Sequence, residues 1–217
     1  IPANLFEENC QIFLVPMVNP DGVDLVTGGI PEGSVQWEKA RSLADNYPSI
    51  PFPNGWKANL LGVDLNLQYP AGWLQAREIK FSQGYTKPGP RDYVGKAPLT
   101  QRESRALADF TRYLDPALIL AYHTQGEQIY WKYDDIDVPG ALALGQEFAR
   151  LSGYALEETP YASGFAGYKD WFIKTWRRPG FTIEAGLGEN PLPLSQFDSI
   201  YAKNLGILTT AALGLPE

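Results

Sequence analysis

Short apolar runs alternate along this chain with longer segments whose apolar residues recur at helical spacing. Residues 118–122 and 180–184 are apolar runs of strand length, and segments of helical periodicity precede them at 100–114 and 169–176. This alternation is typical of an α/β domain in which helices flank a mixed, mostly parallel and twisted sheet. No internal repeat or shift in composition marks a boundary, so the sequence predicts a single domain over residues 1–217.

Turn and cap signals predict further elements. The sequence Asn-Pro-Asp-Gly that begins at Asn19 is a strong turn signal, and the apolar run at 12–18 before it is typical of a buried strand. Thr100 and Glu103 form a capping-box pattern at the start of the helix predicted at 100–114. The other predicted elements are a short strand at 62–65, helices at 140–152 and 195–213, and turn-rich loops at 26–59 and 82–98.

The charge balance and the apolar runs exclude several kinds of partner. The formal net charge is -7 and no basic block is present, which argues against nucleic acid or an anionic membrane surface. No apolar run approaches the roughly 20 residues of a membrane span, so no membrane insertion is expected. The only cysteine, Cys10, cannot form an internal disulfide, and its apolar surroundings predict a buried thiol in a strand. Residues 1–10 lack the basic lead and apolar segment of a signal peptide and are typical of the interior of a domain.

Polar residues follow three of the predicted strands. Asp64 and Asn66 come at the end of one strand, the single histidine His123 follows the second, and Glu184 ends the third. Ligands of open α/β sheets bind where strands end. A histidine, a carboxylate and an asparagine at such an edge suit amide hydrolysis, in which the carboxylate activates a water and the imidazole holds a metal or moves a proton.

Each of these residues also has a structural explanation. A lone histidine after an apolar strand is often a satisfied structural residue, and a glutamate that ends a strand is often solvated or caps a helix. Asp64 and Asn66 are of the type that bonds its own backbone in turns. Composition and periodicity alone therefore leave the chain as a hydrolase-like α/β domain of open function.

Five segments together carry more information than any one of them. They read VPMVNPDGVDL, GVDLN, AYHTQGEQIYW, YASGFAGYKDW and PGFTIEAG, and they occur in the order found in zinc carboxypeptidases of the carboxypeptidase A family. The chain resembles that family from about residue 10 to residue 210. Within the family it looks most like the bacterial γ-D-glutamyl-L-diamino acid endopeptidases, which cut peptidoglycan stem peptides.

The resemblance implies a zinc site and a set of roles. His123 matches a zinc ligand, and Glu184 matches the glutamate that acts as general base and general acid. Tyr161 best matches a mobile tyrosine that closes over substrate, and Asn66 matches a residue that orients substrate by hydrogen bonds. Neutral imidazole is a good zinc ligand, and zinc lowers the pKa of its bound water, so the residue types suit these roles.

Lys169 and Asp170 match the substrate pocket of the family. Lys169 falls at the base of the pocket for the residue after the scissile bond, where a cation would pair with a side-chain carboxylate such as that of meso-diaminopimelic acid. The alternative is that Lys169 lies on a solvated helix face.

The chain departs from the family pattern at three places. The His-x-x-Glu motif that carries the first two zinc ligands is missing, because the chain has no second histidine. We expect an N-terminally shortened polypeptide whose remaining zinc ligands come from another fragment of the same protein; the alternative is a natural non-catalytic relative.

Asn66 is followed by Leu67 where exopeptidases carry an arginine that clamps the terminal carboxylate, which favours an endopeptidase. Leu61 replaces an arginine that steadies the oxyanion, and four candidates for that role stay open, namely Lys57, Asn59, Arg177 and Arg178.

The leading functional hypothesis is therefore a zinc-dependent peptidase that hydrolyses the γ-D-glutamyl–diamino acid bond of stem peptides. A metallocarboxypeptidase that releases C-terminal residues is the second enzyme hypothesis, and a peptide-binding relative without the metal is the third. A peptidoglycan substrate would imply the cell envelope, a secreted protein or the sporulating cell as the place of action.

Overall fold

The structure, a computed structural model, describes residues 10–214. Residues 1–9 and 215–217 lie outside the described part. Most of the segment 1–10, which the sequence predicts to come from the interior of a domain, is therefore not described. The described residues form two compact units. We call them the sheet unit (10–16, 117–159 and 172–214) and the loop unit (17–116 and 160–171). The expectation of a single domain over 1–217 stays a prediction.

The sheet unit is built on a four-stranded sheet with the order β1-β4-β2-β3. β1 (Ile119–His123) runs parallel to β4 (Gly180–Glu184), and β2 (Gln128–Tyr130) runs antiparallel to β4 and parallel to β3 (Ala155–Glu157). The predicted α/β class with a mixed, mostly parallel sheet is thereby confirmed. The two apolar runs at 118–122 and 180–184 are strands as predicted.

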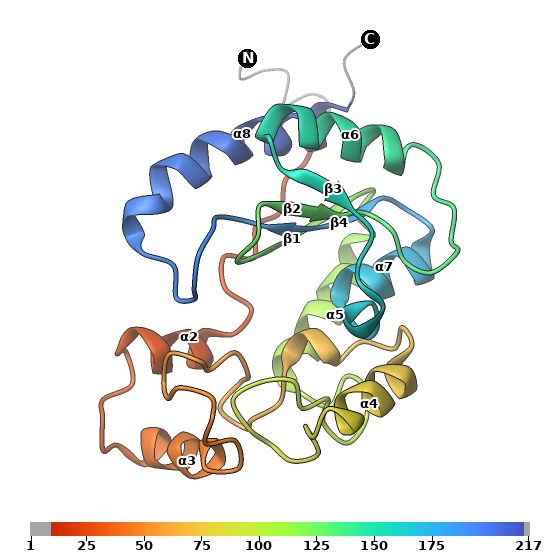
Figure 1. The fold of residues 1–217 in the computed structure, drawn as a ribbon. Helices are drawn as coiled ribbons and strands as arrows, with labels where there is room; N and C mark the ends of the chain where they lie inside the picture. The colour runs from red at the N-terminus through yellow and green to blue at the C-terminus, as the bar shows by residue number, and fades with distance from the viewer. Residues whose placement is uncertain (1–9, 215–217) are drawn as a thin grey trace. The chain divides into compact units, whose positions relative to one another are not determined.

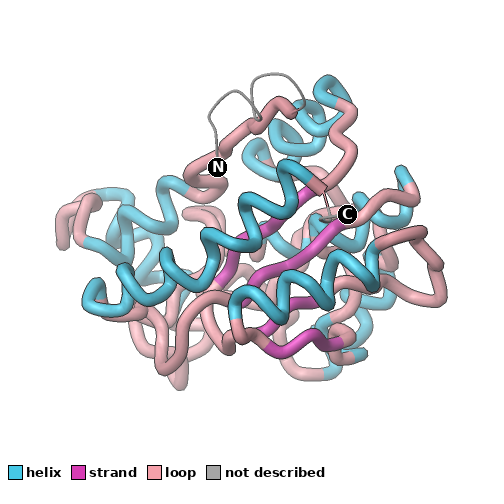
Figure 2. Tube along the Cα trace, turned by 90° about the horizontal axis from the view of Figure 1, so that it is seen from above, coloured by secondary structure: helices cyan, strands magenta, loops and turns pink. Residues whose placement is uncertain are grey.

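Helices α6 (Ala141–Ser152) and α8 (Phe197–Leu213) cover one face of this sheet (Figure 1) and lie over the strands in the view from above (Figure 2). α6 ends as predicted at Gly153, whose φ of 75° is a left-handed conformation that favours glycine. The buried core of this layer consists of Ile129, Phe148, Tyr154, Phe181, Ile183, Ala185 and Ile207. Each large apolar side chain buried there contributes roughly 1.5–3 kcal/mol.

The opposite face of the sheet is packed at one end and polar at the other. Side chains alternate along a strand, so Thr182 and Glu184 point away from the face that buries Ile183. At the start of β4, a Cβ on Gly180 would lie 3.2 Å from Phe172 of α7 (Tyr168–Trp176). The strand starts are therefore covered, while polar residues occupy the strand ends on the same face.

The loop unit consists of helices joined by long turns. Its helices are α2 (Pro20–Thr27), α3 (Val35–Ala44), η1 (Leu65–Leu67), α4 (Trp73–Ser82), α5 (Arg102–Leu114) and η2 (Tyr161–Ser163); a further short helix of the sheet unit, η3 (Leu194–Gln196), leads into α8. One small core gathers Leu25, Ala40, Ala44, Trp56 and Ala58, and another gathers Leu67, Trp73, Ala76, Val94 and Ala166. None of the helices in the described part is long and apolar enough to cross a membrane.

The strand predicted at 12–18 is wrong. The structure assigns no strand there, and the side chains of Ile12 and Leu14 are 56% and 79% exposed. Cys10 is half-buried and likewise outside any strand. Asn19 does not begin a turn but caps α2: its side chain accepts from Gly22 N at 3.2 Å, and a proline follows at the first helical position. An apolar run becomes a strand only where a neighbouring strand accepts its backbone hydrogen bonds.

Three other local predictions differ from the structure. The strand predicted at 62–65 is wrong: residues 62–64 have no regular structure, and η1 follows, since the Asp64 carboxylate accepts from Asn66 N at 3.1 Å and caps this short helix. The capping box is absent, since Thr100 Oγ1 binds Gln68 and Ala97 instead. The loop predicted at 26–59 contains α3, whose N-cap Ser34 accepts from Trp37 N at 3.3 Å.

Candidate active site

The structure brings two predicted site residues onto one rung of the sheet. His123 on β1 pairs with Glu184 on β4, and Gln128 on β2 pairs with Glu184 from the other side. Paired residues of neighbouring strands project to the same face, so the three side chains form one row at the polar end of the sheet. The Ala185 N–H donates to His123 O at 2.8 Å, which fixes the two strand exits against each other.

The loops that follow His123 and Glu184 are tied together by hydrogen bonds. Gly126 N donates to Gly186 O at 2.8 Å, and Asn190 Nδ2 donates to Thr124 O at 3.1 Å. Gly186 has a φ of 76°, and a Cβ there would lie 2.6 Å from Leu192. The backbone that follows His123 and Glu184 is therefore held in one arrangement.

Tyr130 adds a hydroxyl to the same polar face. It lies two residues after Gln128 on β2, and its hydroxyl donates to Gln128 Oε1 at 2.6 Å. Burial raises the pKa of the Tyr130 phenol, and the charges of Glu184 and Glu157 raise it further. The phenol is therefore a neutral donor near pH 7. Neither Gln128 nor Tyr130 was expected from the sequence, because a strand of three residues is too short to show an alternating pattern.

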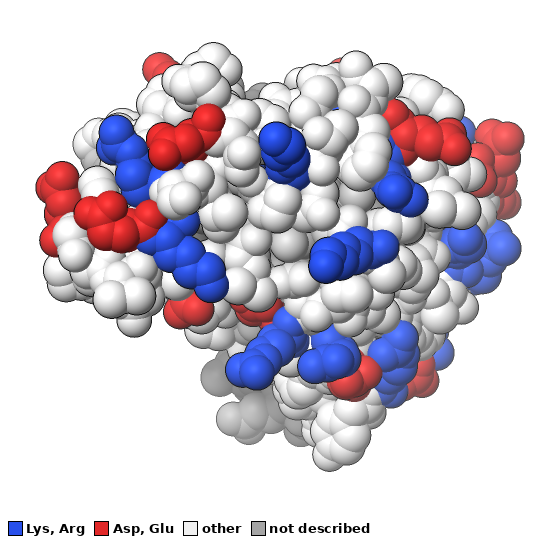
Figure 3. All heavy atoms as spheres, turned by 90° about the horizontal axis from the view of Figure 1, so that it is seen from below, with Lys and Arg blue, Asp and Glu red and all other residues white. Residues whose placement is uncertain are grey.

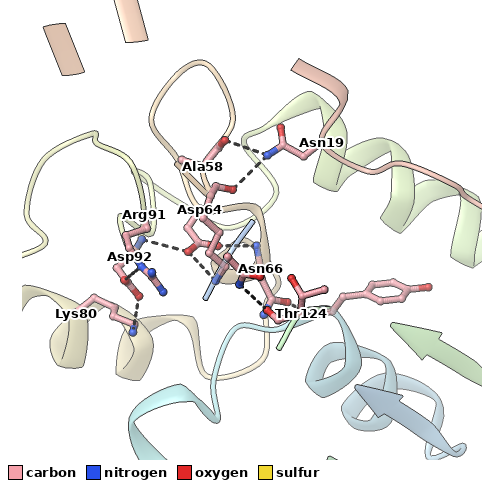
Figure 4. A network of polar contacts seen from close by, with 11 residues as sticks. Asn19, Ala58, Asp64, Asn66, Lys80, Arg91, Asp92 and Thr124 are labelled. Carbon is pink, nitrogen blue, oxygen red and sulfur yellow. Dashed lines mark hydrogen bonds and ion pairs between the residues drawn. The ribbon is translucent and has the colours of Figure 1, made fainter. Parts of the chain in front are cut away.

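Asn66 lies in the loop unit within a network of polar contacts (Figure 4). Asp64, only 1% exposed, accepts hydrogen bonds from Asn66 N and Asp92 N, both at 3.1 Å, and from Lys57 Nζ at 3.0 Å. Asn66 Oδ1 in turn accepts from Tyr168 N at 3.4 Å. The network thus holds the backbone of Asn66 through Asp64 and its side chain through the first residue of α7.

Lys169 and Asp170 form a buried ion pair. Lys169 Nζ lies 2.6 Å from Asp170 Oδ1, and both side chains are 4% exposed. Gly167 N donates to Asp170 Oδ2 at 3.2 Å. Burial raises the pKa of the Asp170 carboxyl above its ordinary value, although the charge of Lys169 opposes the shift. The alternative that Lys169 lies on a solvated helix face is therefore wrong.

Tyr161 stands apart from these buried groups. It is the first residue of η2, it is 74% exposed, and its ring packs edge-on against Phe165 with 5.2 Å between centroids.

The residues considered for the missing arginines are also placed. Leu67 is 6% exposed in the core cluster with Trp73, so the side chain after Asn66 points into the core. Asn59 is 1% exposed, and its amide bonds to Gln101, Glu103, Leu61 and Val63. Among the four oxyanion candidates, the amide of Asn59 is thus fully occupied by its own loop and by the start of α5.

The described residues do not by themselves complete a zinc site. No group of three or more His, Cys, Asp and Glu residues in the described part is placed to hold a metal ion. Catalytic zinc takes three protein ligands and keeps one position open, and His123 is the only histidine. His123 can supply one ligand, and the remaining donors are not found in residues 10–214.

Sequence comparison assigns the chain to a family. Residues 3–205 match the zinc carboxypeptidase family, and the chain belongs to that family. The predicted family is thereby confirmed. The family is one of zinc enzymes, which agrees with the expected cofactor at the level of the family.

Two bacterial relatives and one solved structure are particularly informative. The chain is 52% identical over 194 residues to Gamma-D-glutamyl-L-diamino acid endopeptidase 1 of Lysinibacillus sphaericus, covering 89% of this chain and 47% of the relative. It is 40% identical over 210 residues to the uncharacterized protein YqgT of Bacillus subtilis (strain 168), covering 97% and 54%. The chain thus spans about half the length of the curated relatives it matches. The carboxypeptidase A of Helicoverpa armigera shares the fold, with a TM-score of 0.61 and 16% identity over 94% of this chain and 52% of that one.

Proposed function

We propose that the protein containing this chain is a zinc-dependent peptidase that hydrolyses the γ-D-glutamyl–diamino acid bond of peptidoglycan stem peptides. The proposal rests on the rung that pairs His123 with Glu184 at adjacent strand ends. The 52% identical relative, named for this endopeptidase reaction, supports the choice of substrate.

Glu184 carries the proton in this reaction. Its carboxylate takes a proton from a water as the water oxygen attacks the carbonyl carbon of the amide. The same proton then passes to the nitrogen of the leaving amine as the carbon–nitrogen bond breaks. His123 is proposed as one zinc ligand. Zinc dependence is proposed for the whole protein and not for this chain alone, because the described residues provide no full set of zinc ligands.

Residues of the loop unit are proposed to bind substrate. Asn66 and Tyr161 would hydrogen-bond the peptide, and Lys169 with Asp170 would recognise the diamino acid. The backbone of Asn66 is fixed by Asp64, which keeps its amide preorganised, while the exposed Tyr161 is accessible to a peptide.

The deciding experiment compares two glutamate variants in a preparation that cleaves a peptide containing the γ-D-Glu–meso-diaminopimelate bond. Glu184→Gln should lower kcat by roughly 10²–10⁴-fold with unchanged zinc content. Glu189→Gln, at an exposed position in the following loop, should leave kcat unchanged. Normal turnover by Glu184→Gln would overturn the proposal.

The second candidate, a carboxypeptidase that releases C-terminal residues, is disfavoured by Leu67. A buried leucine cannot make the bidentate contact by which an arginine holds a terminal carboxylate. A stem peptide with an amidated C-terminus separates the two enzymes, since only an endopeptidase should cleave it at an undiminished rate. A peptide-binding relative without activity would bind both peptides and cleave neither.

A further inference from the structure

Gln128 occupies a position in the polar row that no role yet explains. It lies beside Glu184 on the side away from His123, and the two strands that carry them are antiparallel neighbours. Directly paired residues of antiparallel strands have their Cβ atoms about 4.5–5.5 Å apart on the same face. The side chains of Gln128 and Glu184 therefore leave the sheet next to each other on one face.

The amide of Gln128 is oriented by Tyr130. The phenol donates to Oε1 at 2.6 Å. Its pKa is raised further above the ordinary value, so it is protonated near pH 7. With its carbonyl oxygen engaged, the amide directs its Nε2 hydrogens elsewhere, and the described residues show no hydrogen bond from Nε2. Gln128 is half-buried, and Nε2 is not among the buried polar atoms of the described part that lack a partner. Gln128 thus presents an oriented pair of N–H donors next to Glu184.

The order of residues along the rung indicates which part of a substrate meets these donors. Glu184 returns a proton to the leaving amine, so the residue that carries this amine must lie against Glu184. With His123 on the side of the attacked carbonyl, the leaving residue extends past Glu184 toward Gln128. A diamino acid in this place offers carboxylate or carbonyl oxygens as acceptors.

We propose that Gln128 binds a carboxylate or carbonyl oxygen of the leaving diamino acid, and that Tyr130 is the residue that positions its amide. The inference rests on the proposed function, because it uses the role of Glu184 to orient the substrate. It adds a specificity residue to the proposed substrate contacts.

Binding to the 217-residue chain tests the inference without turnover. The probe is a peptide with the γ-D-Glu–meso-diaminopimelate bond, titrated into ¹⁵N-labelled protein. The side-chain amide signals of Gln128 are identified by their loss in Gln128→Leu. As peptide is added, they should shift and reach their final positions at the same peptide concentration as the backbone signals of β4. In the free protein, Tyr130→Phe should move these amide signals, because the hydrogen bond to Oε1 is lost.

Affinities of matched variants complete the test. Gln128→Leu should raise Kd about tenfold, the change expected for one lost hydrogen bond to a charged acceptor. Gln128→Glu, which has no donor, should raise it at least as much, and Tyr130→Phe should raise it less. The control Gln146→Leu alters an exposed glutamine of α6 and should leave Kd unchanged.

The outcomes separate this inference from the proposed function. An unchanged Kd in Gln128→Leu, unmoved Gln128 amide signals in the presence of bound peptide, or no binding of the peptide would overturn the role of Gln128. Normal turnover by Glu184→Gln would instead overturn the proposed function. Loss of turnover in Glu184→Gln together with an unchanged Kd in Gln128→Leu would remove only the present inference.

Discussion

The ammonium group of Lys80 lies 2.7 Å from Asp92 Oδ1, and the two side chains are only 11% and 12% exposed. Burial raises the pKa of the Asp92 carboxyl, but the hydrogen bond and charge of Lys80 outweigh it, so its pKa lies below the usual value. A carboxyl whose pKa is lowered by folding stabilises the protein above its unfolded pKa. This contribution is lost as the pH falls through the folded pKa.

Asp92→Asn should therefore destabilise the protein in a pH-dependent way. At pH 7 the free energy of unfolding should fall by about 3 kcal/mol, because Lys80 is left buried without its carboxylate. Urea unfolding should show this difference shrinking as the pH is lowered below 3.8, the ordinary pKa of aspartate. Asp109→Asn breaks an exposed pair with Arg112 and should cost less than about 1 kcal/mol. A deficit in Asp92→Asn that is equal at pH 7 and pH 3 would contradict the assignment.

Gly62→Ala should destabilise the loop that precedes Asn66. The φ of Gly62 is 70°, and a Cβ there would lie 2.7 Å from Gly89 N, a backbone atom that cannot move aside cheaply. We expect a loss of about 2–3 kcal/mol in chemical unfolding, from strain and from displacement of the neighbouring loop. Gly84→Ala has a similarly positive φ but open space around its Cβ, so it should cost only about 1 kcal/mol. If both variants lost the same free energy of unfolding, a steric clash between the Cβ at position 62 and Gly89 would be ruled out.

Leu67→Arg should not create a carboxypeptidase. The side chain of Leu67 is buried with Trp73 and Val94, so an arginine there would place an unpaired charge in the core. The free energy of unfolding should fall by about 3 kcal/mol or more. Leu61→Arg, at a position that is 53% exposed, should change stability by less than about 0.5 kcal/mol. A stable Leu67→Arg protein that gains release of C-terminal residues would refute this placement.

Lys169→Met should change substrate preference if the buried pair recognises the diamino acid. The ratio of kcat/KM for diaminopimelate-type over lysine-type stem peptides should fall roughly tenfold, because the cation that pairs with the extra carboxylate is removed. The single variant also leaves Asp170 unpaired, so stability should fall as well. The double variant Lys169→Met/Asp170→Asn should recover stability but not the ratio. An unchanged ratio in both variants would exclude Lys169 as the specificity residue.

The strands and helices that the sequence predicted correctly carry their signal locally. β1 and β4 are apolar runs ended by polar residues, and α6 is ended by Gly153. β2 and β3 have three residues each, which is too short for a periodic signal, so their existence depends on pairing with distant segments.

Burial was harder to predict than helicity. Ala106, Leu107, Phe110, Tyr113 and Leu114 recur at helical spacing along α5, which predicts that they form its buried stripe. The residues that α5 buries are instead small, namely Ser104, Ala108 and Thr111, while Tyr113 is 84% exposed. Which face of a helix is buried depends on what packs against it, and that information lies elsewhere in the chain.

The candidate site shows the same limit. His123 and Glu184 were recognisable because each ends a strand, and the structure places them on one rung. The sequence did not reveal that Lys169 pairs with its own neighbour Asp170, because adjacent residues on a helix do not ordinarily face each other. Gln128 and Tyr130 became visible only through the register of β2 against β4.

The solitary histidine gives this 217-residue chain a built-in probe. Because the sequence has no second imidazole, the ring proton signals of His123 need no assignment, and a reagent that modifies imidazoles reports on a single position. Its rung partner is Glu184, so this one resonance reports on the polar ends of β1 and β4. The electrostatics of the strand ends can thus be followed in solution through one line of a spectrum.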